Sequence, residues 1–403
     1  MLQVAEAQAR ILAGLAVTPV EWVPLPQAVG RVLAGDLHAR RDQPPVAVSA
    51  MDGYAVRAVD TAETGRLFRL VGEAAAGTLG DTCLQPGETV RIFTGGAMPA
   101  GADAVVIQEH ASVDGGGVRF SAGVQPGTFV RPAGLDFSRG WRGLTAGMLL
   151  DARAIGLAAS LGHVWLAVRR RPRVGLLATG NELRWPGETP EGSQIASSNT
   201  ITLGAMLAGW GAEPVDLGIC PDDGEALAAR VREARGLDLL ATTGGASVGD
   251  YDLVQEALGR EGMELDFWKI AMRPGKPLLF GRLGPVPILG FPGNPVSTAV
   301  CALVFLRAVL QKMLALPVGL GLGEVELANA LPANDLRQDY LRASYVEGSH
   351  GRRVKTAQRQ DSSMLATFAR ADALVVRPPF DPARAPGAAI VAIDLASALE
   401  NLR

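Results

Sequence analysis

Three apolar runs, each ending in a polar or glycine-rich loop, decide the fold of this chain. Residues 173–182 read RVGLLATGNE, residues 213–223 read EPVDLGICPDD, and residues 237–252 read LDLLATTGGASVGDYD. Segments of helical period lie between them, at roughly 199–210 and 224–234. Strands that alternate with helices at this spacing predict βαβ crossovers and a central, doubly wound, mostly parallel α/β sheet.

The three loops leave the predicted sheet at its carboxyl edge, where such sheets bind their ligands. They bring the carboxylates of Glu182, Asp222 and Asp252 to that edge. Two carboxylates about 4 Å apart repel by about 4 kcal/mol at an effective dielectric of 20, so a cluster needs a cation. Oxygen ligands favour Mg²⁺ over zinc. Neighbouring lysines, a wider separation of the acids, or plain helix caps are the alternatives.

The loop 242–252 is the most informative single motif. Gly244 and Gly245 allow a ligand to approach the backbone closely, and successive amide groups there can hold an oxyanion. Ser247 adds a hydroxyl, and Asp252 adds a carboxylate for a metal. A glycine-rich turn with Asp252 as the cap of the next helix is the simpler interpretation.

A second anion site is predicted where residues 290–297, GFPGNPVS, open a long apolar helix. Asn294 is a natural N-cap and Pro295 a natural first-turn residue, and Ser297 follows in the same turn. A helix start beside glycine favours anions through its free amide groups and its dipole. A purely structural cap is the alternative.

Three cations lie in residues 267–277, FWKIAMRPGKP. They are Lys269, Arg273 and Lys276, and the two prolines of the segment make its second half a stiff loop. Cations on a stiff loop suit a polyanionic ligand better than a solvated surface does.

The composition argues against several classes of protein. The 403 residues, 48% hydrophobic, are enough for several cores, and the net charge of −3 indicates no nucleic-acid surface. The N-terminus lacks a signal-peptide layout, and the longest apolar run, 298–306, is too short to span a membrane. Three cysteines without a Cys-x-x-Cys pair, and only four histidines, favour a reducing cytoplasm and argue against zinc.

The chain divides into four predicted parts. Residues 1–45 with 146–171 form an N-terminal linker domain, which includes a helix at 151–161 capped by Asp151. Residues 46–145 form a β-rich domain, 172–317 the α/β domain, and 318–403 a small C-terminal β domain.

With these segments in order, the chain resembles the molybdopterin molybdenumtransferase family, the MoeA proteins and the E-domain of gephyrin-like proteins. Pro-Gly-Lys-Pro followed by Pro-Gly-Asn-Pro-Val-Ser is the most specific combination. The resemblance extends from SAMDGYAVR at 49–57 and RIFTGG at 91–96 to residues 361–374, close to the whole chain. It implies insertion of molybdenum from molybdate into adenylylated molybdopterin, with release of AMP and with Mg²⁺ or a similar ion.

The resemblance also implies an elongated homodimer with a shared active site, in which residues 1–45 with 146–171 are the linker and dimerisation domain. The α/β domain of one copy would contribute Glu182, Asp222, Asp252, Lys269, Arg273, Lys276 and Ser297. The β-rich domain of the other would contribute Asp52, Thr94 and Asp136. Further expected partners are the molybdopterin adenylyltransferase and downstream cofactor-handling proteins, with no nucleic acid and no membrane.

Two positions depart from the family pattern. Asn181 stands where the family usually has Asp, which affects any metal role there. Arg273 replaces the usual Lys before Pro-Gly-Lys-Pro, so the charge is kept but a planar fork replaces a point donor. Adenylylation of molybdopterin is an alternative function, although that enzyme resembles only the α/β domain. A non-catalytic pterin- or peptide-binding scaffold is another.

Overall fold

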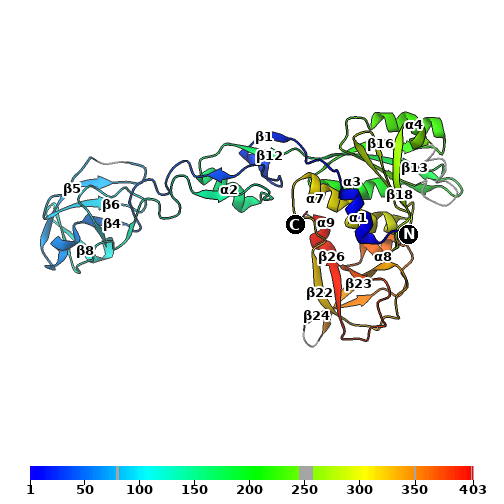
Figure 1. Cartoon of the computed structure of the whole chain (residues 1–403). Coiled ribbons are helices and arrows are strands. Elements are labelled where there is room, and N and C mark those ends of the chain that lie inside the picture. The colour runs from blue at the N-terminus through cyan, green and yellow to red at the C-terminus, as the bar shows by residue number, and fades with distance from the viewer. Residues whose placement is uncertain (79–80, 245–256, 349–350, 401, 403) are drawn as a thin grey trace.

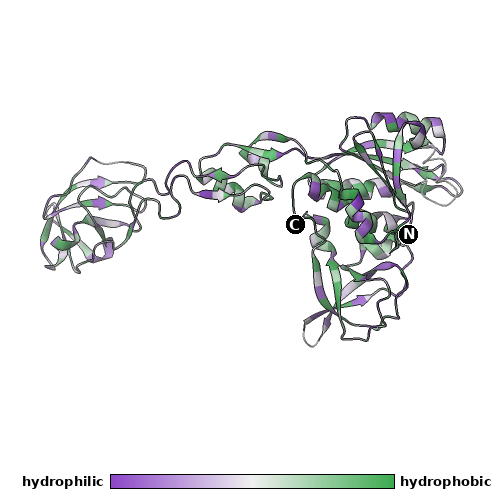
Figure 2. Ribbon diagram, in the orientation of Figure 1, coloured by the Kyte–Doolittle hydropathy of each residue, from purple (hydrophilic) through white to green (hydrophobic). Residues whose placement is uncertain are grey.

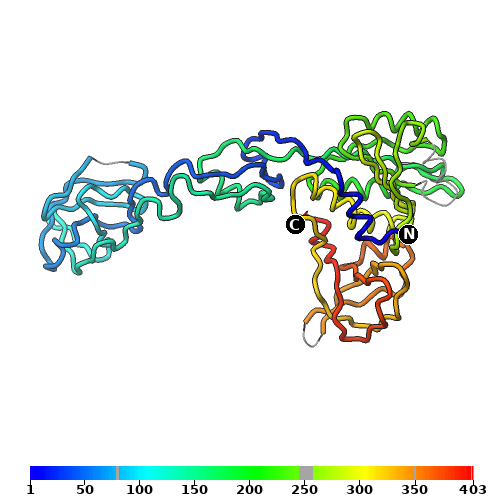
Figure 3. The backbone as a smooth tube through the Cα atoms, viewed as in Figure 1, coloured from blue at the N-terminus to red at the C-terminus, as the bar shows by residue number. Residues whose placement is uncertain are grey.

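The computed structural model describes residues 1–78, 81–244, 257–348, 351–400 and 402 of an elongated molecule (Figure 1). A β-rich unit lies at one end, a narrow linker follows, and two packed units form the other end. Figure 3 shows the chain running out to the β-rich unit and returning beside itself through the linker. The predicted class, a central α/β unit with β-rich units attached, is confirmed.

The α/β unit holds a six-stranded sheet in the order β16-β13-β17-β21-β20-β18. Its first four strands are parallel, and β20 runs antiparallel to both of its neighbours. The strands are β13 (Arg173–Thr179), β16 (Glu213–Cys220), β17 (Leu239–Thr243), β18 (Met263–Trp268), β20 (Leu279–Leu283) and β21 (Val286–Phe291). Small strands β14 (Leu183–Arg184) and β15 (Ile195–Ala196) pair beside it. The three strands predicted from the sequence therefore exist in the predicted parallel arrangement.

Helices cover this sheet and form the largest core. They are α1 (Val4–Leu12), α3 (Asn199–Gly209), α4 (Gly224–Glu233), α6 (Pro295–Cys301) and α7 (Arg307–Met313), with a π-helical turn at Ala302–Leu306. The stretch Pro295–Met313 is long and apolar enough to cross a bilayer, but 94% of its most apolar window is buried. Its hydrophobic colouring in Figure 2 is therefore that of a core helix.

Helix α1 lies on the α/β unit, although the sequence-based division groups it with the linker. Ala7 and Ile11 are buried in the main core, and Gln8 donates to the carbonyl of Val304 at 3.1 Å. Leu2 accepts a hydrogen bond from the amide of Ala271 at 2.7 Å. The N-terminus therefore reaches the segment that carries the predicted cations.

The linker is built on β1 (Val20–Pro24) paired antiparallel with β12 (Trp165–Arg169), and on α2 (Ala152–Ser160). The carboxylate of Asp151 accepts from the amide of Ala154 at 2.9 Å, which confirms the predicted cap of α2. Short strands β2 (Leu37–His38) and β11 (Arg142–Leu144) pair farther along, as do β3 (Val48–Ser49) and β10 (Val130–Arg131).

The β-rich unit is a six-stranded sheet in the order β7-β4-β6-β5-β9-β8. Its strands are β4 (Gly53–Val56), β5 (Leu67–Ala74), β6 (Glu88–Ile92), β7 (Ala104–Ile107), β8 (Ala111–Asp114) and β9 (Gly117–Phe120). A small aromatic core of Tyr54, Phe68 and Phe120 supports it.

The C-terminal unit is a sheet in the order β19-β23-β24-β22-β26-β25. Its own strands are β22 (Leu322–Leu327), β23 (Gln338–Gly348), β24 (Gly351–Thr356), β25 (Ala373–Arg377) and β26 (Ala389–Asp394), with helices α8 (Leu365–Ala369) and α9 (Leu395–Glu400). The edge strand β19 (Met272–Arg273) belongs to the cation-bearing segment of the α/β unit. The two units therefore share one sheet edge.

Candidate functional site

The ends of three parallel strands are held together at the carboxyl edge of the α/β sheet. Gly244 follows β17 with φ +93°, and a Cβ there would overlap the carbonyl oxygen of Thr179 at the end of β13. Asn199, at the start of α3, donates to the hydroxyl of Thr243 and to the carbonyl of Gly293, both at 2.8 Å. This edge is therefore a closely packed platform in which residue 244 needs to be glycine.

A cleft of roughly 400 Å³ opens on this platform, and we name it the strand-end cleft. It is lined by Ala178, Thr179, Glu182, Leu183, Ile195, Ala196, Ser197, Ser198, Asn199, Thr243, Gly244, Gly293, Asn294, Pro295 and Ser363. Within the described part of the chain, the buried hydroxyls of Thr179 and Ser197 have no hydrogen-bond partner. Four residues predicted from the sequence meet here: Glu182, Gly244, Asn294 and Pro295.

Two side-chain-to-backbone hydrogen bonds link the loops that carry the predicted acids Glu182 and Asp222. Asp222 accepts from the amide of Asn181 at 3.1 Å, and the Asn181 side chain accepts from the amide of Asp222 at 3.2 Å. Glu182 folds back over Gly180, where an added Cβ would lie 2.5 Å from its Oε2. Asn181, a departure from the family pattern, therefore fixes the turn that presents both acids.

No group of three His, Cys, Asp or Glu side chains able to hold a metal occurs among the residues that the structure describes. Asp252, the third predicted ligand, lies outside the described residues, as do Gly245 and Ser247. The three-carboxylate metal site therefore stays a prediction.

A second cleft, of roughly 410 Å³, adjoins the first, and we name it the lysine cleft. It shares Gly293 and Asn294 with the strand-end cleft. Its other lining residues are Met272, Arg273, Pro274, Gly275, Lys276, Pro277, Pro292, Ser297, Arg337, Gln360, Asp361 and Ser362. Predicted residues Arg273, Lys276, Asn294 and Ser297 therefore lie on one cavity.

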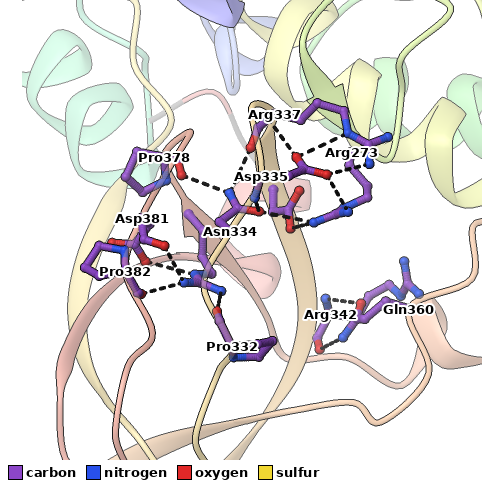
Figure 4. Close-up of polar contacts among 12 residues, drawn as sticks. Arg273, Pro332, Asn334, Asp335, Arg337, Arg342, Gln360, Pro378, Asp381 and Pro382 are labelled. Atoms are coloured by element: carbon purple, nitrogen blue, oxygen red, sulfur yellow. Dashed lines mark hydrogen bonds and ion pairs between the residues drawn. The ribbon is translucent and has the colours of Figure 1, made fainter.

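The three predicted cations are in different situations. Lys276 is exposed, and no hydrogen bond or ion pair engages its ammonium among the described residues. Lys269 has φ +75°, and its Nζ lies 3.5 Å from the ring centroid of Trp268, outside the lining of either cleft. The guanidinium of Arg273 points toward the C-terminal unit, as Figure 4 shows, and contacts Asn334, Asp335 and Asp339 there. Its guanidinium is therefore engaged by protein groups, and the predicted contact with a substrate stays a prediction.

The start of α6 is held by hydrogen bonds to Ser362 of the C-terminal unit and not by a side-chain cap of its own. Asn294 occupies the N-cap position but makes no side-chain cap, contrary to the sequence-based interpretation. The side-chain amide of Asn294 donates to the hydroxyl of Ser362 at 2.7 Å, and the backbone amide of Val296 donates to the backbone carbonyl of Ser362 at 3.1 Å.

Sequence reasoning missed the polar run 360–363, which lines both clefts. Asp361 accepts from the hydroxyl of Ser363 at 2.6 Å and from its amide at 2.8 Å, and these two bonds hold the pKa of Asp361 below its usual range. The available signal was the run Gln-Asp-Ser-Ser itself, four polar residues that are followed by Met364 and α8.

The β-rich unit carries the remaining predicted residues. Asp52 accepts from the amide of Thr94 at 2.7 Å and from its hydroxyl at 2.8 Å, and these bonds lower the pKa of Asp52. Asp136 lines a separate cavity of roughly 740 Å³, together with Arg131 and the segment 43–46. The unit built on β4 and β6 lies at the opposite end of the molecule from the two clefts (Figure 1). A single chain therefore does not bring all predicted residues together.

Family profiles match nearly the whole chain. The MoeA N-terminal region (domain I and II) matches residues 2–162, a probable molybdopterin binding domain matches 175–312, and the MoeA C-terminal region (domain IV) matches 324–395. These ranges include every predicted site residue.

Named relatives agree with these profiles. The chain is 36% identical over 337 residues to the molybdopterin molybdenumtransferase of Nostoc sp., covering 82% of this chain and 77% of the relative. It is 32% identical over 386 residues to the enzyme of that name from Haemophilus influenzae, covering 93% and 94%. The crystal structure of the molybdopterin biosynthesis MoeA protein from Pyrococcus horikosii superposes with a TM-score of 0.86 at 26% identity, over 98% of this chain and 99% of that one.

Proposed function

The chain belongs to the MoeA family of molybdopterin molybdenumtransferases, and on this premise we propose that it inserts molybdenum from molybdate into adenylylated molybdopterin with release of AMP. Both substrates are anions that repel each other, so the enzyme contributes mainly by positioning them together and offsetting their charge.

The pair of adjoining clefts is the observation that carries this proposal. The lysine cleft offers the Lys276 ammonium and the Ser297 and Ser362 hydroxyls, which suit a small oxyanion such as molybdate. The strand-end cleft suits the pterin with its phosphate–AMP linkage, because it lies at the carboxyl edge of the parallel sheet, where such sheets bind ligands, and adjoins the lysine cleft. Their common wall, Gly293–Asn294, would hold the two reactants next to each other.

Lys269 is proposed as a second cation for the phosphate groups. Its ammonium lies over the ring of Trp268, a contact worth about 0.5–1 kcal/mol at an exposed site, which a phosphate can displace. Its positive φ is the kind of backbone strain that concentrates at functional sites.

Mg²⁺ is proposed as the divalent ion. The donor set fits in kind: Glu182 and Asp222 are oxygen ligands on consecutive strand-end loops, and the Asn181 contact holds the two loops together. Asp252 would complete the set. When bound, the ion would offset the negative charge of the phosphate that leaves with AMP.

A homodimer is proposed to complete the site. Asp52, Thr94 and Asp136 of the β-rich unit would act on the clefts of a second copy, since they lie at the far end of their own chain. The linker offers an apolar contact surface for that copy: Trp22 is 68% exposed and Trp165 is 53% exposed on paired strands.

The three cysteines are free, in keeping with the cytoplasmic location expected from the sequence.

The proposal is tested by assaying AMP release from adenylylated molybdopterin in the presence of molybdate and Mg²⁺. We expect Glu182→Ala to abolish release and Glu191→Ala, an exposed acid of the next loop, between β14 and β15, to retain it. Chelation of divalent ions should stop the reaction, and added Mg²⁺ should restore it. If the protein instead consumes ATP and adds AMP to molybdopterin, the adenylyltransferase function is supported. If it binds the pterin without turnover, a scaffold is supported.

The shared site is tested by mixing two inactive variants. A dimer that pairs Glu182→Ala with Asp52→Ala has one damaged site and one intact site. Random exchange of subunits should therefore restore about a quarter of the wild-type activity. No restoration after subunit exchange would contradict a site shared between copies.

A further inference from the structure

Segment 270–273 is held by two distant parts of the chain and by a bond within its own loop. On one side, the Ala271 amide donates to the carbonyl of Leu2 at 2.7 Å. On the other side, β19 pairs with β23 in parallel, and the Gln338 amide donates to the Ala271 carbonyl at 2.9 Å. The segment also closes on itself, since the Ile270 amide donates to the Lys276 carbonyl at 2.9 Å. The position of Lys276 therefore depends on the C-terminal sheet.

The side chain of Arg273 completes this attachment. Its Nη1 donates to Oδ2 of Asp335 at 3.1 Å, and its Nη2 donates to Oδ1 of Asn334 at 3.1 Å and to Oδ2 of Asp339. Asp335 is shared with Arg337, whose Nη2 lies 2.8 Å from the same carboxylate oxygen. Figure 4 shows these groups converging between the two units.

The burial of one acid makes Arg273 difficult to replace. Asp339 is only 2% exposed, and a buried carboxylate needs a counter-charge close to it. The bond to Asp339 is also the main reason that the pKa of Arg273 is raised. A planar guanidinium can serve three acceptors at once, whereas a lysine ammonium is a point charge on a flexible chain.

We propose that Arg273 is a positioning residue: it fixes segment 270–276 to the C-terminal sheet and so holds Lys276 toward the lysine cleft, without contacting the anion. The proposal rests on the function assigned above, because it gives the lysine cleft to molybdate. This structural role of Arg273 differs from the contact with substrate that the sequence predicts.

Kinetics of Arg273→Lys test this role. We expect the KM for molybdate to rise about tenfold, the size expected from loss of one charge-assisted hydrogen bond, while kcat changes little. Arg384→Lys is the matched control, because its guanidinium also binds a buried carboxylate, that of Asp381, but lies in the C-terminal unit outside both clefts; its KM should change less. An unchanged KM for Arg273→Lys, or equal changes in the two variants, would overturn the proposal.

A double variant separates positioning from direct contact. If Arg273 acts only through Lys276, adding Arg273→Lys to Lys276→Met should raise the molybdate KM no further. A further rise of similar size would mean that Arg273 binds the anion itself, which contradicts the proposal.

Hydrogen exchange tests the attachment independently of any activity. In full-length Arg273→Lys, the amides of Ile270 and Gln338 should exchange about tenfold faster than in the wild type, because the contacts that close the segment weaken. Unchanged exchange at both amides would refute the positioning role even if the enzyme were active. Faster exchange in a protein that does not use molybdate would instead count against the proposed function alone.

Discussion

Substitution of Gly275 by alanine has a consequence that follows directly from the geometry. Gly275 has φ +116°, and a Cβ there would overlap Sγ of Cys301 and lie 3.1 Å from Sδ of Met272. The backbone strain costs about 1–3 kcal/mol, and overpacking against the buried sulfur atoms costs about 1–3 kcal/mol more. We therefore expect Gly275→Ala to lower the free energy of unfolding by about 2–6 kcal/mol and to raise the molybdate KM, since Lys276 is the next residue.

Urea unfolding followed by far-ultraviolet circular dichroism measures this loss, because the long helices lie in the α/β unit. The control is Cys301→Ala, which removes the fully buried sulfur that the new methyl group would meet. The two substitutions together should cost less than the sum of their separate losses, by about 0.5–3 kcal/mol. Strictly additive losses would show that overlap with Cys301 plays no part, and an undestabilised Gly275→Ala would refute the reasoning altogether.

Two further predictions concern single carboxylates. Asp223 caps α4 by accepting a hydrogen bond from the backbone amide of Ala226 at 2.7 Å, so Asp223→Ala should lower the free energy of unfolding by about 0.5–2 kcal/mol while AMP release persists. The neighbouring variant Asp222→Ala should lose AMP release and keep its stability. The reverse result would exchange the two roles. Thr94→Val removes one of the two hydrogen-bond donors that hold the pKa of Asp52 below its usual value of 3.8, so the pKa measured by NMR titration should rise toward that value. The acid limb of the pH–activity profile should then move to higher pH. An unmoved limb would show that ionised Asp52 takes no part in the reaction.

The parallel sheet and its loops could be predicted because their signals are local. Hydrophobic runs mark the strands, and Gly244 marks a close backbone contact, so the strand-end cleft follows from adjacent residues. The partners of Arg273 lie 61 to 66 residues farther along the chain, and Ser362 lies 68 residues from Asn294. Such pairings leave no periodic pattern in a single sequence. The sequence therefore predicts two of the three cations that line the lysine cleft, Arg273 and Lys276, but not Arg337, and not which of them the protein itself neutralises.

The charges around the lysine cleft give a physical reason for the proposed divalent ion. Three cationic side chains line it, but Arg273 and Arg337 share the carboxylate of Asp335, whose pKa is lowered to about 2 chiefly by Arg337. Among the described lining residues, Lys276 is the cation without such a pair, and Asp361 adds negative charge to the same cavity. One ammonium does not compensate a molybdate dianion. The residues proposed from a second copy, Asp52, Thr94 and Asp136, bring carboxylates and no cation. We therefore infer that the proposed divalent ion is needed to hold the anion as well as to transform it.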